Sequence, residues 1–172
     1  MIQAGDIGFA HSTGIMGRLI RVGEWLKFRK GSSWNHMFIV DRVENEVPYI
    51  IQATLKGVTN TMMLEDVAPG GKYITMPPPD CVMRDELLVF ARRQVGLRYG
   101  YWTIVAIALD ILTWQWFPAF RGARKPSWIC SALGCESLRY GGWLYDWIDI
   151  YCVTPAQAWL ALKEDTPSGM GA

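Results

Sequence analysis

The first half of the chain is a series of short apolar runs separated by polar or glycine-containing breaks, which is the pattern of β-strands. The polar segment 41–46 separates two of the strongest runs and therefore predicts a hairpin loop. We expect strands at residues 7–10, 36–40, 47–53, 57–59 and 72–76, and we expect Pro77-Pro78-Pro79 to end this β-rich half.

The second half has helical spacing. Asp80 can cap a helix that ends at Gly96, with an apolar face made by Leu87, Leu88, Ala91 and Val95. Residues 154–157, Thr-Pro-Ala-Gln, combine a capping residue with a proline at the first helical position. This combination predicts the start of a closing helix.

Two further segments have a helical pattern. Residues 13–30 place apolar positions opposite basic ones, which suits either packing on the domain or lying on an anionic membrane. Residues 102–120 are strongly apolar, but Asp110 and Gln115 interrupt the run. A core or interfacial helix is therefore favoured over a membrane span. Any peripheral membrane contact is expected through these two segments.

Composition adds limits to this picture. The chain has 172 residues, 51% of them hydrophobic and 19% charged, which is enough to build one buried core. We expect a single domain over residues 1–165, followed by a flexible tail at 166–172. The net charge of +1 gives no electrostatic reason to expect nucleic-acid binding. Nine tryptophans suggest a thick core, an aromatic-lined groove or membrane contact.

The four cysteines are Cys81, Cys130, Cys135 and Cys152, and no two of them form a C-x-x-C pair. With only two histidines in the chain, we expect no metal site, and we expect no cofactor. The N-terminus lacks a basic region followed by an apolar run, so no signal peptide is expected. We therefore expect free thiols and a cytoplasmic location.

Cys130 is the strongest candidate for chemistry. Pro126 and Ser127 predict a helix start with Ser127 as the N-cap, and residues from Trp128 onward can run helically until Gly141. Cys130 then falls in the first turn, where free backbone N–H groups and the helix dipole favour a thiolate. The alternative interpretation is a buried structural cysteine.

A cysteine nucleophile needs a base, and the chain offers His11 and His36. His36 opens the most strand-like segment, where a rigid strand can hold the ring steady beside an open cleft, so we favour it over His11. Gln52 lies in the predicted partner strand, and its side-chain oxygen can accept the imidazole N–H and fix the tautomer. An ordinary solvated strand residue is the alternative for Gln52.

Several short motifs together resemble the NlpC/P60 papain-like superfamily. In ordinary members the cysteine helix precedes the histidine strand, whereas here His36 precedes Cys130 by 94 residues. That order is similar to the circularly permuted branch, the YiiX-like and lecithin:retinol acyltransferase-like proteins. The motifs are Gly5-Asp6-Ile7-Gly8-Phe9, Asn35-His36-Met37-Phe38-Ile39-Val40, Ile50-Ile51-Gln52-Ala53 with Gly57-Val58, Gly96-Leu97-Arg98-Tyr99-Gly100 and Thr154-Pro155-Ala156-Gln157.

The resemblance covers roughly residues 4–160 and implies an α+β papain-like fold, circularly permuted, with an antiparallel sheet packed against helices. It implies Cys130, at a helix N-terminus, as the nucleophile and His36 as the base. It also implies Gln52 as the third polar residue and Tyr99 as a residue on the substrate or oxyanion side.

Three features depart from the family pattern. The third polar position is often Glu or His, and Gln52 cannot carry the charge that stabilises an imidazolium. Phe38 stands where the family has a small residue, and residues 102–124 form an unusually apolar insertion.

The implied chemistry is acyl transfer through a thioester on Cys130, with His36 moving the proton. We expect a peptide or acyl-amide substrate, such as a cell-wall peptide, and Trp34 and Trp128 as candidate lining residues of the cleft. Two alternatives stay open. One is a lipid-directed acyl hydrolase or acyltransferase at a membrane surface, and the other is a non-catalytic binding module on the same fold.

Overall fold

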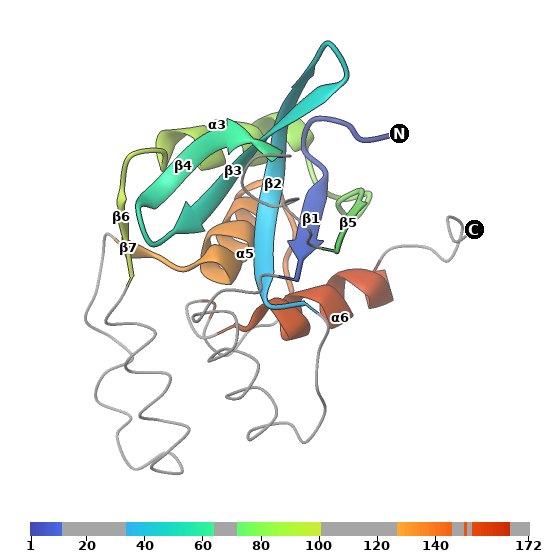
Figure 1. The fold of residues 1–172 in the computed structure, drawn as a ribbon. Helices are drawn as coiled ribbons and strands as arrows, with labels where there is room; N and C mark the ends of the chain where they lie inside the picture. Colours follow the sequence, from blue (N-terminus) through green and yellow to red (C-terminus); the bar gives the residue numbers. More distant parts are fainter. Residues whose placement is uncertain (12–33, 64–71, 101–126, 146–149, 151–152, 166–172) are drawn as a thin grey trace, which may run out of the picture.

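The computed structural model describes residues 1–11, 34–63, 72–100, 127–145, 150 and 153–165, and these are built around an antiparallel sheet. Its strands are β1 (Ile7–Ala10), β2 (His36–Glu44), β3 (Val47–Thr54), β4 (Gly57–Met62) and β5 (Tyr73–Met76). They lie in the order β4-β3-β2-β1-β5, with β2 at the centre (Figure 1). The predicted strands of the first half are confirmed.

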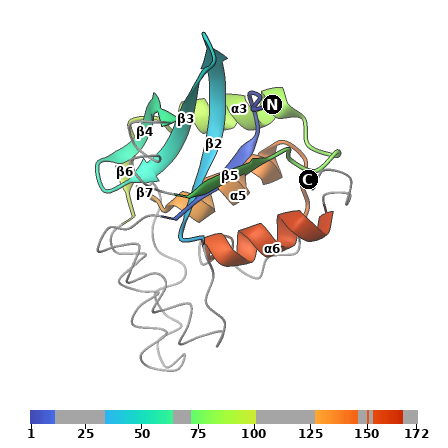
Figure 2. The same cartoon turned by 45° about the vertical axis from the view of Figure 1, so that its right-hand side comes forward.

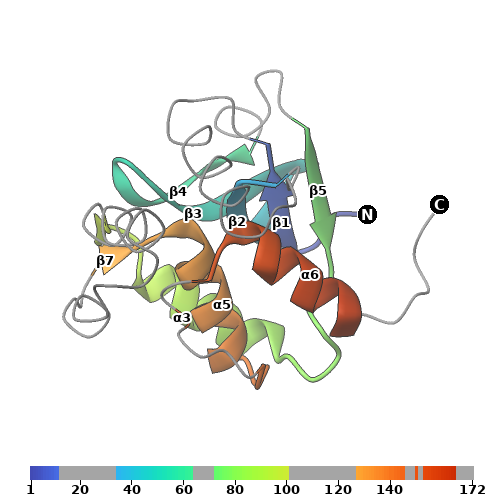
Figure 3. The ribbon, with the colours of Figure 1, turned by 90° about the horizontal axis from the view of Figure 1, so that it is seen from below.

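Within the described residues, the helices are α3 (Arg84–Arg93), α5 (Cys130–Tyr140) and α6 (Pro155–Asp165). Figure 3 shows all three on the same side of the sheet. Helix α5 packs against β2 and β3, and α3 packs against α5. Two short strands, β6 (Arg98–Tyr99) and β7 (Ser127–Trp128), pair in parallel beside them. The fold is therefore α+β, as the sequence predicts.

The central strands bury side chains on both faces of the sheet, because successive strand residues point to opposite sides. On the helix side, Ile39 and Ile51 pack with Leu133 of α5 in the main core. On the other side, Phe38 and Val40 belong to a second, smaller buried cluster. Each of these side chains stabilises the fold by about 1.5–3 kcal/mol when fully buried. Because β2 is buried on both faces, its first residues are held in place within the sheet.

Phe38 fits in this sheet because Gly8 lies directly opposite it. The two residues are cross-strand partners in β1 and β2. A Cβ atom on Gly8 would lie 2.0 Å from Cε2 and Cζ of the Phe38 ring. The missing side chain of Gly8 therefore makes the room that the Phe38 ring occupies.

The hairpin between β2 and β3 is tighter than the predicted loop over residues 41–46. β2 continues to Glu44, and only Asn45 and Glu46 form the turn. Both turn residues have positive φ, 51° and 67°, as a type I′ hairpin turn requires. Residues 41–44 are mostly polar, but they extend β2 because Arg42, Val43 and Glu44 pair with β3. A bulge lies between Val40 and Arg42.

The predicted helix after the prolines is shorter than expected at both ends. Asp80 does not cap it, because Met83 occupies the N-cap position without a side-chain cap and its backbone N–H bonds to the Gly141 carbonyl. At the other end the helix stops at Arg93, and Gly96 lies three residues beyond it. Leu87, Leu88 and Ala91 are buried as predicted, whereas Val95 is exposed.

The start of α6 agrees with the prediction from the Thr-Pro-Ala-Gln sequence. The Gln157 backbone N–H donates to Thr154 Oγ1 at 3.3 Å, and the Thr154 backbone N–H donates to Gln157 Oε1 at 3.0 Å. This reciprocal pair is a capping box, and it satisfies two donors at the helix start.

Several predicted features lie outside the described residues. They are the amphipathic segment 13–30, the loop around Pro69-Gly70-Gly71, the apolar segment 102–120, Cys152 and the tail 166–172. Within the ranges that are described, no helix combines the length and apolarity needed to cross a membrane.

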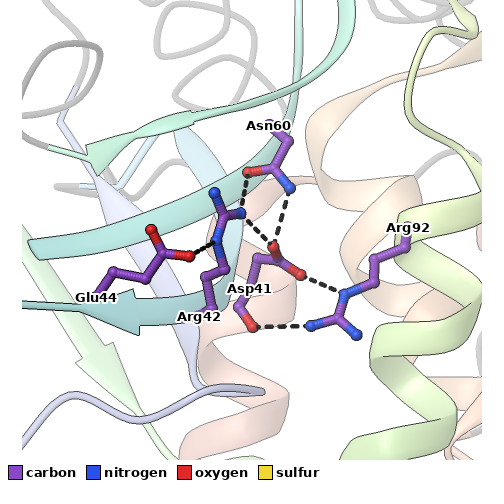
Figure 4. Close-up of polar contacts among 5 residues, drawn as sticks. All are labelled: Asp41, Arg42, Glu44, Asn60 and Arg92. Carbon is purple, nitrogen blue, oxygen red and sulfur yellow. Dashed lines mark hydrogen bonds and ion pairs between the residues drawn. The ribbon is translucent and has the colours of Figure 1, made fainter.

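A buried carboxylate fixes the bulge in β2 to its neighbours, as Figure 4 shows. Asp41 accepts hydrogen bonds from Arg92 Nε of α3 at 2.6 Å, from Asn60 Nδ2 of β4 at 2.9 Å and from Arg42 Nη1 at 2.8 Å. Arg42 in turn bonds to Glu44. Burial raises the pKa of Asp41, but the hydrogen bonds from Arg92, Asn60 and Arg42 outweigh it and lower the pKa below its usual value.

We expect Asp41→Asn to lower the free energy of unfolding by about 2 kcal/mol at pH 7, because it weakens hydrogen bonds made to a charged, buried acceptor. A carboxyl with a lowered pKa in the folded state stabilises the fold above its unfolded pKa of about 3.9. That contribution is lost as the pH falls through the folded pKa. In urea unfolding at a series of pH values, the difference between wild type and Asp41→Asn should shrink below about pH 4.

Glu44→Gln is the matched control, since it removes a carboxylate from the same cluster at a position that is 54% exposed. We expect it to change stability little, because exposed ion pairs contribute little. Equal effects of the two substitutions would contradict a structural role for the buried carboxylate.

Candidate active site

Cys130 is the first residue of α5, and it is buried. The predicted helix start is wrong by a few residues: Ile129 is the N-cap, and Ser127 and Trp128 form β7 instead. They adopt strand geometry because they pair with Arg98 and Tyr99 of β6. The main consequence of the prediction holds, since Cys130 lies in the first turn, where backbone N–H groups lack helical partners.

A close approach of α5 to β2 brings Cys130 beside the sheet. Gly134, one turn along α5, faces Met37 of β2, and both are buried. A Cβ on Gly134 would lie 2.4 Å from Cε and 2.6 Å from Sδ of Met37. A side chain at position 134 would have to displace the end of the Met37 side chain or move α5 away from β2, so Gly134 contributes to the spacing between the elements that carry Cys130 and His36.

His36 is the first residue of β2, and its side chain hydrogen-bonds to the Cys130 thiol. Burial raises the pKa of Cys130. The positive charge and the hydrogen bond of His36 lower it, as do backbone hydrogen bonds from Met37 and Ser131. The net result is a thiol pKa below its ordinary value. The site therefore favours a thiolate–imidazolium pair.

The backbone hydrogen bond from Met37 depends on where two strands separate. Val40 directs its N–H to Asp6 on the β1 side, so the alternation of an antiparallel strand directs the Met37 N–H towards β3. The pairing of β2 with β3 ends at Ile39 and Ile51, before it reaches Met37. The Cys130 sulfur accepts this N–H in place of a backbone carbonyl.

Gln52 of β3 holds the imidazole from the other side. The His36 Nε2 and Gln52 Oε1 atoms are 2.7 Å apart. The Gln52 amide nitrogen donates to Thr61 Oγ1 of β4 at 3.5 Å, which directs its oxygen to the ring. With Gln52 Oε1 as the acceptor, Nε2 is the ring nitrogen that donates to it. The contact that the sequence suggests for Gln52 is present.

The aromatic residues proposed for the cleft are buried or half-buried, and two of them lie two residues before a member of this pair. Trp128 is buried two residues before Cys130, where its Nε1 donates to Gln94 Oε1 of α3 at 3.0 Å and its ring packs edge-on against Phe90. Trp34 is half-buried two residues before His36. Tyr99 is buried in β6, paired with Trp128.

The other sequence candidates have different surroundings. His11 follows the end of β1, where its backbone N–H bonds to the Lys72 carbonyl. Cys135 is buried in α5, and burial together with Cys130 and Glu136 raises its pKa far above the ordinary value. Cys81 is exposed, and the three described cysteines are free thiols, as expected.

Sequence reasoning missed the supporting residues Met37, Thr61, Gln94, Ser131 and Gly134. Only Gly134 carried a usable signal, because a glycine inside a predicted helix often marks close packing. The other four contribute backbone groups or contacts between distant segments, which no local pattern indicates.

Comparison with known proteins supports the fold. No protein-family model matches the sequence, and a search of curated proteins finds no match. Among solved structures, the fold is similar to that of metalloprotein yiiX, DUF1105, from Escherichia coli O157:H7, with a TM-score of 0.54 and 18% sequence identity. The match covers 81% of this chain and 66% of that protein, so this chain spans just under two thirds of its length. The fold agrees with the resemblance to YiiX-like proteins.

We expect Gly134→Ala to lower the free energy of unfolding by about 1–3 kcal/mol, because the added methyl overpacks the contact with Met37. It should also slow alkylation of Cys130 by iodoacetamide at pH 6, because α5 is pushed away from His36. Urea unfolding and the alkylation rate measure the two effects. The double variant Gly134→Ala with Met37→Val should recover part of both, since valine lacks the Sδ and Cε atoms that clash. A Gly134→Ala protein with wild-type reactivity would contradict this account of the spacing.

Proposed function

We propose that this protein is a cysteine hydrolase of the permuted NlpC/P60 papain-like type that cleaves an amide or peptide bond through a thioester. Cys130 is the nucleophile, His36 carries the proton, and Gln52 orients His36. The observation that carries the proposal is the contact of a first-turn cysteine with a histidine that is itself hydrogen-bonded at Nε2. A nucleophile, its base and an orienting group are the parts that such catalysis needs.

The reaction proceeds in two halves. The Cys130 thiolate attacks the substrate carbonyl carbon, and the protonated imidazole of His36 gives its proton to the departing amine as the C–N bond breaks. Water then attacks the thioester carbonyl and gives a proton to His36. The C–S bond breaks, and the acid product leaves with the thiolate restored. The backbone N–H of Cys130, at the start of α5, is the candidate donor to the oxyanion in both halves.

The order of the elements supports the permuted branch. The strand that carries His36 comes before the helix that carries Cys130, the reverse of ordinary NlpC/P60 members. The similarity to yiiX in fold agrees with this assignment.

The word metalloprotein describes yiiX and not this chain. In the described ranges of this chain, no group of three or more His, Cys, Asp or Glu side chains is placed to hold a metal ion. At the site the available donors are Cys130 and His36, and the amide of Gln52 already bonds to the imidazole. These residues do not fit a metal centre, and the proposed mechanism contains no step through one.

The main alternative substrate is an acyl lipid at a membrane surface. The basic pattern of residues 13–30 and the apolar run at 102–120 favour it. The thioester chemistry would be the same, with an ester oxygen or an acyl acceptor in place of the amine. Release of fragments from purified cell-wall peptide supports the amide reading. Turnover of acyl esters alone, together with binding to anionic vesicles, supports the lipid reading.

The thiol of Cys130 should react with iodoacetamide with a pH midpoint below the ordinary cysteine value of about 8.5, because its pKa is lowered in the folded protein. The His36→Ala variant should return the midpoint to that value or above, because burial, the largest effect on this pKa, is then opposed only by the backbone hydrogen bonds from Met37 and Ser131. Peptide mass spectrometry of the labelled protein separates Cys130 from the exposed Cys81, which is an internal control. Labelling of Cys130 no faster than Cys81 at pH 6 would instead indicate a non-catalytic binding module.

In hydrolysis assays with fluorogenic peptide amides and cell-wall peptides, Cys130→Ser and His36→Ala should each lower kcat/KM by about 10³-fold or more. We expect Gln52→Ala to lower kcat/KM by about 100-fold, because a small misplacement of the base is costly. Gln52→Glu is the matched variant, since it keeps an acceptor oxygen in the same place and should retain most activity. If Gln52→Ala were as active as wild type, Gln52 would have no orienting role.

A further inference from the structure

The segment that runs from Val153 into α6 contacts the start of α5 and the residues next to the start of β2. One contact reaches the start of α5. The Ser131 hydroxyl donates to the Val153 backbone carbonyl at 2.5 Å, and Ser131 is almost fully buried. Its own backbone N–H is one of the two that bond to the Cys130 sulfur. Ser131 therefore links the first turn of the nucleophile helix to the residue that leads into α6.

The second contact reaches the start of β2. Trp159 of α6 packs edge-on against Trp34, with ring centroids 5.9 Å apart, and against Phe9 of β1, with centroids 5.3 Å apart. Trp34 lies two residues before His36. Figures 1 and 2 both show the first turns of α6 beside the beginning of β2. Each aromatic pair of this kind contributes about 0.5–1.5 kcal/mol beyond the area it buries.

The segment between these two contacts is short and well fixed. Only five residues lie between Val153 and Trp159, and they include the capping box of Thr154 and Gln157. Because both backbone donors of the cap are satisfied, the start of α6 holds a single geometry. A displacement at either contact is therefore transmitted to the other.

We propose that residues 153–159 act as a clasp that sets the position of Cys130 relative to His36, with Ser131 and Trp159 as positioning residues. The proposal rests on the cysteine-hydrolase function above and adds to it the residues that hold its two reacting groups together. The clasp matters because a thiolate–imidazolium pair is stable in a buried site only at hydrogen-bonding distance. Neither positioning residue touches the substrate in this account.

The pH dependence of Cys130 alkylation measures the interaction between Cys130 and His36. In the described part of the chain, His36 from β2 is the charged side chain that lowers the pKa of the Cys130 thiol, whereas Cys130 and Glu136 of α5 act on the pKa of Cys135. Cys135 stays neutral across the working range because its pKa is raised by burial. A change in the pH dependence of Cys130 reactivity therefore reports the distance to His36.

The test uses the full chain and iodoacetamide as the probe, with the labelled cysteine identified by peptide mass spectrometry. Ser131→Ala and Trp159→Leu should each lower the alkylation rate of Cys130 at pH 6 by about tenfold, equivalent to an upward shift of one pH unit in the midpoint. Trp159→Phe keeps an aromatic ring at the contact and should give an intermediate loss, and it serves if the leucine variant does not fold.

Two matched controls separate positioning from general destabilisation. Ser137→Ala removes another buried hydroxyl of α5 that donates to a backbone carbonyl, here Leu133 within the same helix. Leu160→Ala changes the residue next to Trp159, which is exposed. Both should leave the pH profile of Cys130 within twofold of wild type, even where urea unfolding shows lower stability.

The outcomes distinguish the two proposals. A low wild-type midpoint that Ser131→Ala and Trp159→Phe leave unchanged would overturn the clasp and leave the hydrolase proposal intact. Equal shifts in Ser131→Ala and Ser137→Ala would overturn it as well, because they would trace the effect to lost stability. A wild-type midpoint at the ordinary cysteine value would overturn both proposals together.

Discussion

The burial of the Cys130 sulfur is the constraint on which the rest of the site depends. A buried thiol is ordinarily inert, because removal from water disfavours its charged form. Here the His36 side chain and two backbone N–H groups offset that cost. All three act over hydrogen-bonding distances, so the site functions only while α5, β2 and the strand next to β2 keep their spacing. Gly134 against Met37, and Gln52 against His36, are the contacts that keep it.

The contacts that position His36 and the ion pairs around Asp41 lie at different places along β2. The ion-paired cluster around Asp41 lies at the bulge of β2, nearer the hairpin end of the strand, whereas His36 is at the strand's beginning. Strand β2 is buried on both faces between these two ends. A long, rigid central strand can therefore be anchored at one end and carry a reactive group at the other. At the reactive end, Met37 pairs with Phe9 of β1 but lies beyond the pairing of β2 with β3.

Much of this architecture follows from local patterns. Apolar runs predicted the five strands, and the Thr154–Gln157 sequence predicted the start of α6, because both signals arise from residues close together in sequence. Cys130, His36 and Gln52 were singled out by residue type and by place in an element. The predicted helix start was two residues too early. Ser127 is a good capping residue by type, but its backbone pairs with β6, which is distant in sequence. Asp80 failed as a cap for a similar reason, since Gly141 supplies the partner of the Met83 N–H. Long-range backbone pairing of this kind leaves no trace in composition or periodicity.

The parallel pairing of β6 with β7 has a consequence for how such a protein diversifies. Arg98–Tyr99 and Ser127–Trp128 are hydrogen-bonded neighbours, and the Gly100 N–H bonds to the Trp128 carbonyl. The residues on either side of segment 101–126 are thus held next to each other, a few residues before the nucleophile. When the entry and exit of an insertion are already held together, doubling its length costs only about 0.6 kcal/mol of closure entropy. Evolution, or an engineer, can therefore exchange the intervening segment for one of different size or polarity while the reacting groups stay in register.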